Sequence, residues 1–197
     1  MNLNPPKNTQ IFVIEGIAGA GKNTLHKELL SQLSDKLVYD FPEEDLLNGW
    51  KHVWIPNITE MRVTLMNNIL DYCSEVLKQH DNAVFIFQRF HLSCIILDFE
   101  KNNIENNSEY IKVLEKLRQF KTHVFLPILE EHEIEHRSAH KERLAEIWQI
   151  HLQNRLQQRG AQSLTDLHKV EQKAYLDLIQ KQNLPYTTVR VEINPAS

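Results

Sequence analysis

The sequence GIAGAGK at Gly16–Lys22 determines the architecture to expect, because it satisfies the G-x-x-x-x-G-K part of a phosphate-binding loop. The four residues before it, Ile11–Ile14, are all apolar and predict a buried strand. The segment Thr24–Leu33 after it repeats leucines at helical spacing. A phosphate in a loop between a strand and a helix would meet backbone N–H groups and the positive end of the helix dipole.

Loop positions have separate predicted roles. Glycine is needed where a Cβ would block close backbone approach or the required φ and ψ values. Lys22 would place a mobile positive charge on the β and γ phosphates of a nucleotide. The residues predicted to bind the nucleotide are Gly16, Gly19, Ala20, Gly21, Lys22, Asn23 and Thr24.

The loop departs from its usual pattern at Asn23, where a serine or threonine hydroxyl normally ligates Mg²⁺. A carboxamide oxygen can coordinate a hard cation, but it is neutral and sits on a longer arm. Thr24 comes next, yet one step along a helix turns the side chain away by about 100°. Asn23 is therefore the candidate metal ligand, and the substitution favours nucleotide binding over ordinary magnesium chemistry.

Size and composition predict one domain spanning residues 1–197, since 42% of the 197 residues are hydrophobic and 24% are charged. The net charge of −4 predicts neither nucleic acid nor a membrane surface as partner, so local arginines and lysines must attract an anionic substrate. Met1–Gln10 is polar and resembles neither a signal peptide nor an anchor. Cys73 and Cys94 lie in apolar-periodic segments, which predicts buried thiols and a cytoplasmic location.

Strand-like and helix-like segments alternate along the rest of the chain. Further strands are predicted at Leu37–Tyr39, Ala83–Phe87, Thr122–Leu126 and Thr187–Ile193. Helices are predicted at Ile58–Val76, His91–Phe99, Tyr110–Phe120, Glu130–Arg159 and Leu164–Gln182, with a loop at Asn102–Ser108 and a helix stop at Gly160. Five strands separated by helices predict an α/β domain with a parallel sheet covered on both faces.

Four more segments have the composition and order of motifs found in one group of enzymes. They are Ile14–Gly16 before the loop, Phe41–Pro42, FQRFHLS at Phe87–Ser93 and RSAHKERLAE at Arg137–Glu146. They are similar, in turn, to the I-E-G opening, the F-P-x-R motif, the D-R-Y-x-x-S motif and the arginine-bearing lid of thymidylate kinases. Deoxynucleoside kinases share the I-E-G opening. The chain resembles this group of P-loop nucleotide kinases over essentially its whole length.

The resemblance implies a three-layer P-loop NTPase fold, with a five-stranded parallel sheet and a helical lid at about residues 130–145. It implies transfer of the γ-phosphate of ATP to a (deoxy)nucleoside monophosphate, with ATP and Mg²⁺ as cofactors. Thymidylate kinases are commonly homodimers. The apolar helix Ile58–Val76 could form such an interface here or could equally be core.

Residue roles follow from the same match. Arg89 ends a buried strand at the edge where open α/β sheets bind ligands, and its guanidinium could hold the acceptor. Lid arginines would stabilise developing charge. The predicted catalytic residues are Lys22, Arg89, Arg137 and Arg143, and the predicted substrate-binding residues are Phe41, Glu43, Arg62 and Arg89.

Departures from the thymidylate kinase pattern leave alternatives open. The loop carboxylate is Ala18, the D-R-Y aspartate is Gln88, and the F-P-x-R arginine is Glu43 or Glu44. A glutamate would repel a substrate phosphate, but it could accept the proton of a nucleoside hydroxyl, as in deoxynucleoside kinases. An acidic helix start explains Glu43 and Glu44 equally well. The alternatives are a deoxynucleoside kinase, or a catalytically degenerate kinase fold that binds nucleotide as a sensor or interaction module.

Overall fold

The computed structural model describes residues 3–43, 58–98, 106–138, 153, 155–157 and 159–191. Strands and helices alternate as the sequence predicts. The strands are β1 (Ile11–Ile14), β2 (Leu37–Phe41), β3 (Ala83–Gln88), β4 (Thr122–Ile128) and β5 (Tyr186–Arg190). The helices are α1 (Lys22–Ser31), α3 (Ile58–Gln79), α4 (His91–Asp98), α5 (Ser108–Gln119), α6 (Glu131–Ser138) and α8 (Leu164–Gln182).

All strand pairings in the sheet are parallel, in the order β2-β3-β1-β4-β5. This confirms the predicted five-stranded parallel sheet. Every residue of β1 and β3 is buried, as expected for strands covered on both faces. Because the strands are parallel, the segments that follow β1, β2 and β3 emerge at one edge of the sheet. The phosphate loop, Glu43 and Arg89 therefore share that edge.

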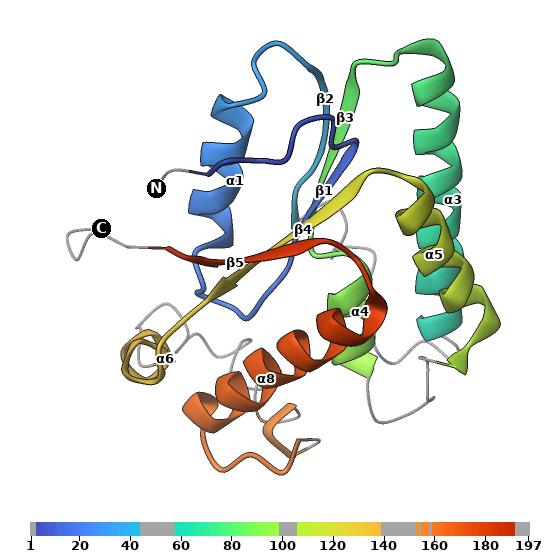
Figure 1. The fold of residues 1–197 in the computed structure, drawn as a ribbon. Helices are drawn as coiled ribbons and strands as arrows, with labels where there is room; N and C mark the ends of the chain where they lie inside the picture. Colours follow the sequence, from blue (N-terminus) through green and yellow to red (C-terminus); the bar gives the residue numbers. More distant parts are fainter. Residues whose placement is uncertain are drawn as a thin grey trace.

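Helices cover both faces of the sheet, with α1 on one side and α3, α4, α5 and α8 on the other (Figure 1). The alternation within β1 produces this division, since successive side chains of a strand point to opposite faces. Phe12 and Ile14 join the core under α1, whereas Ile11 and Val13 join the larger core on the other face.

Several element boundaries differ from the predicted ones, and two of them have a clear local reason. Helix α1 begins at Lys22 rather than Thr24, because Gly21 adopts a left-handed conformation and acts as the N-cap. Helix α5 begins at Ser108, which was predicted to be loop, because the Asn107 side chain accepts hydrogen bonds from the backbone of Glu109 and Tyr110. The last strand ends at Arg190, before the predicted Ile193.

Gly160 is confirmed as a helix stop. Its φ is 60°, and its N–H donates to the Gln157 carbonyl while the Ala161 N–H donates to the Leu156 carbonyl. This pair of bonds is the Schellman motif, which satisfies the last carbonyls of a helix. Of the predicted helix Glu130–Arg159, α6 forms the first part, and residues 139–152, 154 and 158 lie outside the described residues.

The outer face of α3 exposes Met61, Leu65 and Tyr72. These positions fall on one side of a helix with a repeat of 3.6 residues, so they form an apolar stripe. The stripe is suited to an interface, and the homodimer stays a prediction.

Cys73 and Cys94 are buried and unbonded to each other, as predicted. Within the described ranges, no helix combines the length and the apolar character needed to span a membrane.

Candidate functional site

The phosphate loop turns at three glycines with positive φ, namely 129° at Gly16, 80° at Gly19 and 89° at Gly21. A Cβ on Gly21 would lie 2.6 Å from Cγ1 of Val191, and one on Gly16 would lie 3.1 Å from the Pro127 carbonyl oxygen. The predicted need for glycine is thus confirmed. The structure adds that two of these glycines also let the loop pack against the strands beside it.

The start of α1 is open to an anion. Its N-cap, Gly21, contributes no side-chain hydrogen bond, and the first turn contains no acidic residue. The first N–H groups of a helix lack partners within the helix, and they carry the positive end of its dipole. Asn23 and Thr24, both predicted nucleotide ligands, are exposed in this turn, while Ala20 is buried in the loop.

The Lys22 side chain lies across the loop, with only 6% of the residue exposed. Its Nζ donates to the Ile17 carbonyl at 3.0 Å and lies 3.7 Å from Oε2 of Glu43. A buried ammonium group needs such partners, because removing it from water is costly. The lysine is therefore held at the loop, where a phosphate oxygen could replace either partner.

Glu43 and Arg89 form the centre of the site on the β2 and β3 side. The Arg89 Nε lies 2.9 Å from the same Oε2 of Glu43 that faces Lys22. Burial alone would raise the pKa of Glu43, but the neighbouring Lys22 and Arg89 charges outweigh it and hold the pKa below its usual range. The Glu43 carboxylate is consequently ionised at neutral pH, between two cations.

Arg89 adopts an unusual backbone conformation, with φ at 61°. For a residue with a Cβ this region costs about 1–2 kcal/mol, so the surrounding contacts must hold it. The Nη1 of Arg89 donates to the Tyr175 hydroxyl oxygen at 3.3 Å. That hydroxyl also lies 2.9 Å from Ser93 Oγ.

Glu15, the residue before Gly16, organises the start of α4. Its Oε1 accepts hydrogen bonds from the backbone N–H groups of Phe90 at 2.8 Å, Leu92 at 3.0 Å and Ser93 at 3.3 Å. Its Oε2 accepts the hydroxyl of Ser93. Burial raises the pKa of Glu15, and the hydrogen bonds from Ser93 and Phe90 oppose that rise. The carboxylate of the I-E-G segment therefore ties the phosphate loop to the residues after β3.

The residues expected to support a metal do not form a metal cage. Gln88 is 3% exposed, and its Oε1 accepts the backbone N–H of Glu43 at 3.4 Å. Gln88 thus links the end of β3 to the segment that follows β2. In the described part of the chain, no group of three or more histidine, cysteine, aspartate or glutamate side chains could hold a metal.

The predicted lid arginine Arg137 lies on α6 and reaches the loop. Its Nη1 donates to the Gly19 carbonyl, and its Nη2 lies 3.7 Å from Glu133 on the same helix. The structure therefore brings Arg137 together with the loop, as predicted. Arg143 lies outside the described residues, and its role stays a prediction.

The other predicted substrate residues are Phe41 and Arg62. Phe41 stacks on Phe87 with ring centroids 4.8 Å apart, and Phe87 stacks on Phe90 at 4.6 Å, so its visible role is packing. Arg62 is almost fully buried in α3. Binding of substrate by either residue stays a prediction.

Sequence reasoning missed Glu15, Ser93 and Tyr175 as site residues. The first two stand inside quoted motifs, so a signal existed, but neither motif says which groups the side chains meet. Tyr175 had no signal beyond its place in a periodic helix. Its contacts with residues 82 and 86 positions away arise only when α8 packs beside α4.

No protein-family model and no curated protein matches the sequence. Among solved structures, the chain is similar to the YorR protein of Bacillus subtilis in complex with phosphorylated GDP, with 15% identity, 92% of this chain and 85% of that chain covered, and a TM-score of 0.54. It also matches thymidylate kinase from Candida albicans, with 15% identity, 94% and 86% covered and a TM-score of 0.49. Deoxyadenosine kinase from M. mycoides matches with 15% identity, 94% and 92% covered and a TM-score of 0.47.

The similarity to YorR, together with the sheet order and the loop after β1, confirms the predicted three-layer P-loop NTPase fold. A shared fold does not carry a reaction with it. The chemistry therefore has to come from the side chains at the sheet edge.

Proposed function

We propose that this protein is a P-loop kinase that transfers the γ-phosphoryl group of ATP to the hydroxyl of a nucleoside-type acceptor, as deoxynucleoside kinases do. The observation that carries the proposal is the Glu43 carboxylate, which lies 2.9 Å from Arg89 and 3.7 Å from Lys22 at the phosphate loop. It places a base beside the residues that would bind the transferred group.

The donor side would be formed by the loop and α1. The γ and β phosphates of ATP would accept hydrogen bonds from the first backbone N–H groups of α1, which Gly21 leaves uncapped. The Lys22 ammonium group would exchange its hydrogen bond to the Ile17 carbonyl for one to a phosphate oxygen. Arg137, which donates to the Gly19 carbonyl, would stabilise the negative charge that develops on the transferred group. These contacts use positioning and charge, which phosphoryl transfer chiefly requires.

On the acceptor side, the charge of Glu43 would discriminate between a hydroxyl acceptor and a monophosphate acceptor. A hydroxyl attacks phosphorus more readily when a carboxylate accepts its proton. A monophosphate is already anionic, needs no base and would be repelled by an ionised carboxylate at close range. With Glu43 ionised and paired to Arg89, a neutral hydroxyl acceptor fits this arrangement better than a phosphate.

ATP normally arrives with Mg²⁺, so the fit of the site to this ion matters. Asn23 is exposed, and the Gln88 oxygen already accepts the Glu43 N–H. These neutral groups do not replace the hydroxyl and carboxylate found at such positions in kinases. Water and the nucleotide phosphates would have to supply most of the magnesium ligands, with Asn23 as the predicted side-chain contribution.

A monophosphate acceptor is the second candidate, and one observation supports it. The Glu43 side chain is 29% exposed, and its Oε2 occupies a place on Arg89 and Lys22 that a phosphate oxygen could take. If the side chain turned outward, the acceptor phosphate would meet both cations. The Glu43 carboxylate would then occupy the position of the substrate phosphate and would not act as a base.

Turnover of ATP against a panel of nucleosides and nucleoside monophosphates tests these proposals, with the wild type, Glu43→Gln and Lys22→Ala as a blank. Nucleoside turnover that falls about a hundredfold to ten-thousandfold in Glu43→Gln supports the hydroxyl acceptor. Monophosphate turnover that is maintained or increased in Glu43→Gln supports the second candidate. Glu60→Gln is the matched control, because Glu60 is an exposed glutamate in the first turn of α3.

The absence of turnover on every acceptor, with ATP still bound in a direct titration, would contradict both kinase proposals. That result would favour the degenerate kinase fold that binds nucleotide as a sensor. The substitutions at Ala18, Asn23 and Gln88 are the features that agree with it.

A further inference from the structure

A one-way chain of hydrogen bonds runs from Arg89 to the strand that carries the phosphate loop. A guanidinium can only donate, so the Tyr175 hydroxyl accepts from Arg89 Nη1 at 3.3 Å. The single hydrogen of Tyr175 is then left for Ser93 Oγ, 2.9 Å away. Ser93 in turn donates to Oε2 of Glu15. The donor at one end and the acceptor at the other set the direction of every bond.

The members of this chain are enclosed in the protein. Glu15 and Ser93 have no exposed surface, and Tyr175 is 2% exposed. Burial raises the pKa of Tyr175, so its hydroxyl stays protonated over the physiological range. A protonated Tyr175 is the form that can accept from Arg89 and still donate to Ser93. In a dry environment such connected bonds also strengthen one another.

The two partners of Arg89 differ in how firmly they are held. The Glu43 side chain is 29% exposed, and the residue lies beyond the last residue of β2, Phe41. Tyr175 lies in the middle of α8, a helix of 19 residues, with its ring in the core. If Glu43 exchanges its partners during a reaction, Tyr175 is the contact that keeps the guanidinium in place.

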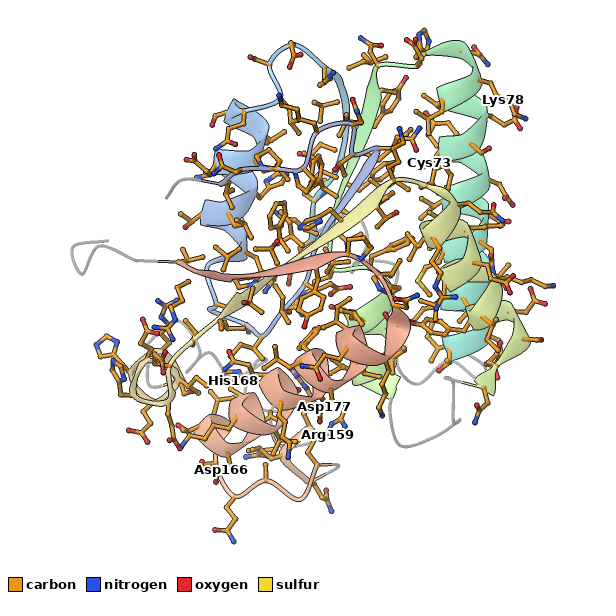
Figure 2. The ribbon with its side chains drawn as sticks, in the orientation of Figure 1. Cys73, Lys78, Arg159, Asp166, His168 and Asp177 are labelled. Carbon is orange, nitrogen blue, oxygen red and sulfur yellow. The ribbon has the colours of Figure 1, made fainter. Side chains whose placement is uncertain are left out.

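Helix α8 also supports the second arginine of the site. Its His168, labelled in Figure 2, has Nδ1 3.0 Å from Ser138 Oγ on α6. Its Lys169 pairs with Glu131 and Glu135 of the same helix. Gln172 of α8 donates to the Leu129 carbonyl at 2.9 Å and accepts from the Leu129 N–H at 2.8 Å. Since α6 carries Arg137, one helix braces both arginines that face the loop.

We propose that Tyr175 is a positioning residue that fixes the guanidinium of Arg89 relative to the phosphate loop through Ser93 and Glu15. It does not touch substrate itself. The inference rests on the proposed function for its kinetic consequence, because Arg89 then stabilises charge in the transferred group. The placement of Arg89 by Tyr175 is a property of the protein alone.

The kinetic test is Tyr175→Phe, which removes one hydroxyl and keeps the ring that packs in the core. We expect kcat to fall about tenfold, the effect of one lost hydrogen bond to a charged group, with the KM values for ATP and acceptor nearly unchanged. Tyr110→Phe is the control, because Tyr110 is also buried and its hydroxyl accepts from Gln182 Nε2 and donates to the His91 carbonyl. Equal losses in both variants would overturn the proposal.

A double-mutant cycle identifies the route of the effect. If Tyr175 acts through Arg89, Tyr175→Phe should change kcat little further in an Arg89→Ala background. Independent, additive losses in the two variants would show that Tyr175 acts elsewhere and would overturn the proposal.

A measurement without turnover separates this inference from the proposed function. The ¹⁵N NMR signal of Arg89 Nε, assigned by its loss in Arg89→Lys, should shift in Tyr175→Phe and stay in place in Tyr110→Phe. If the wild type shows no turnover on any acceptor, the proposed function fails, and this signal alone decides the positioning role. A signal that is unmoved in Tyr175→Phe overturns it whatever the kinetics.

Discussion

The phosphate loop and the acceptor side of the site are built in different ways. The loop is one contiguous segment, Gly16–Thr24, whose conformation comes from positive φ values and the start of α1. The acceptor side is assembled from Glu43, Arg89 and Tyr175, which come from three distant parts of the chain. The loop keeps the G-x-x-x-x-G-K pattern, whereas the acceptor side changes the charges usual in thymidylate kinases. Under the proposed function, the loop binds the donor and the other side of the site selects the acceptor.

The largest effect on binding is expected from Lys22→Ala, which tests whether the loop binds the donor. The ammonium group would make charge-assisted contacts with two phosphates, so its loss should weaken ATP binding by about a thousandfold, or about 4 kcal/mol. Isothermal titration with ATP measures this. Lys27→Ala is the control, because Lys27 lies on the same helix with an exposed side chain. Unchanged affinity in Lys22→Ala would contradict the phosphate-loop assignment.

Gly21→Ala tests whether packing against Val191, as well as the nucleotide, requires glycine in the loop. The new Cβ would combine a φ of 89° with a contact of 2.6 Å to Val191 Cγ1. The free energy of unfolding should fall by about 3 kcal/mol, from left-handed strain plus overpacking. Gly160→Ala has a φ of 60° but open space around it, and it should cost only about 1 kcal/mol. Urea unfolding compares them, and equal losses would exclude the Val191 contact as a cause.

Gln88→Asp tests the acceptor side, where a neutral residue replaces a metal-supporting carboxylate. An added negative charge near the phosphates should increase the magnesium-dependent gain in nucleotide affinity by roughly fivefold, or about 1 kcal/mol. Titration of ATP with and without Mg²⁺ measures that gain. The same gain in wild type and Gln88→Asp would show that this position does not face the metal. Gln32→Asp, at the end of α1, is the control.

The smallest effect is expected from the pH dependence of stability contributed by Glu43. Its pKa lies below the usual 4.5 in the folded protein because Lys22 and Arg89 outweigh the effect of burial. A carboxyl group with a lowered pKa stabilises the fold above its unfolded pKa, and this contribution is lost as pH falls through the folded pKa. The stability difference between wild type and Glu43→Gln should therefore stay constant well above pH 4.5 and shrink as the pH falls below 4.5. A constant difference would show that the ion pairs with Glu43 are absent in solution.

Local patterns were sufficient for the fold and for the donor side of the site. The apolar run Ile11–Ile14, the glycines and the leucine spacing of α1 each act over a few residues, so the sequence alone predicted the loop. Arg137 was also placed correctly at the loop, because the family resemblance supplied a long-range match that periodicity lacks. The N-cap Asn107 was missed, although a side-chain cap is a local signal that the sequence contains.

The contacts on the acceptor side could be identified only from the tertiary structure. The sequence left Glu43 and Glu44 open, and the structure brings the Glu43 carboxylate onto Arg89 and Lys22. It also assembles Glu15, Ser93 and Tyr175, whose contacts span 78 and 82 positions of the chain. A strand, a turn or a helix start is decided by neighbouring residues, so it is visible in sequence. Which charges meet at a sheet edge depends on strand order and helix packing, and these exist only once the whole chain has folded.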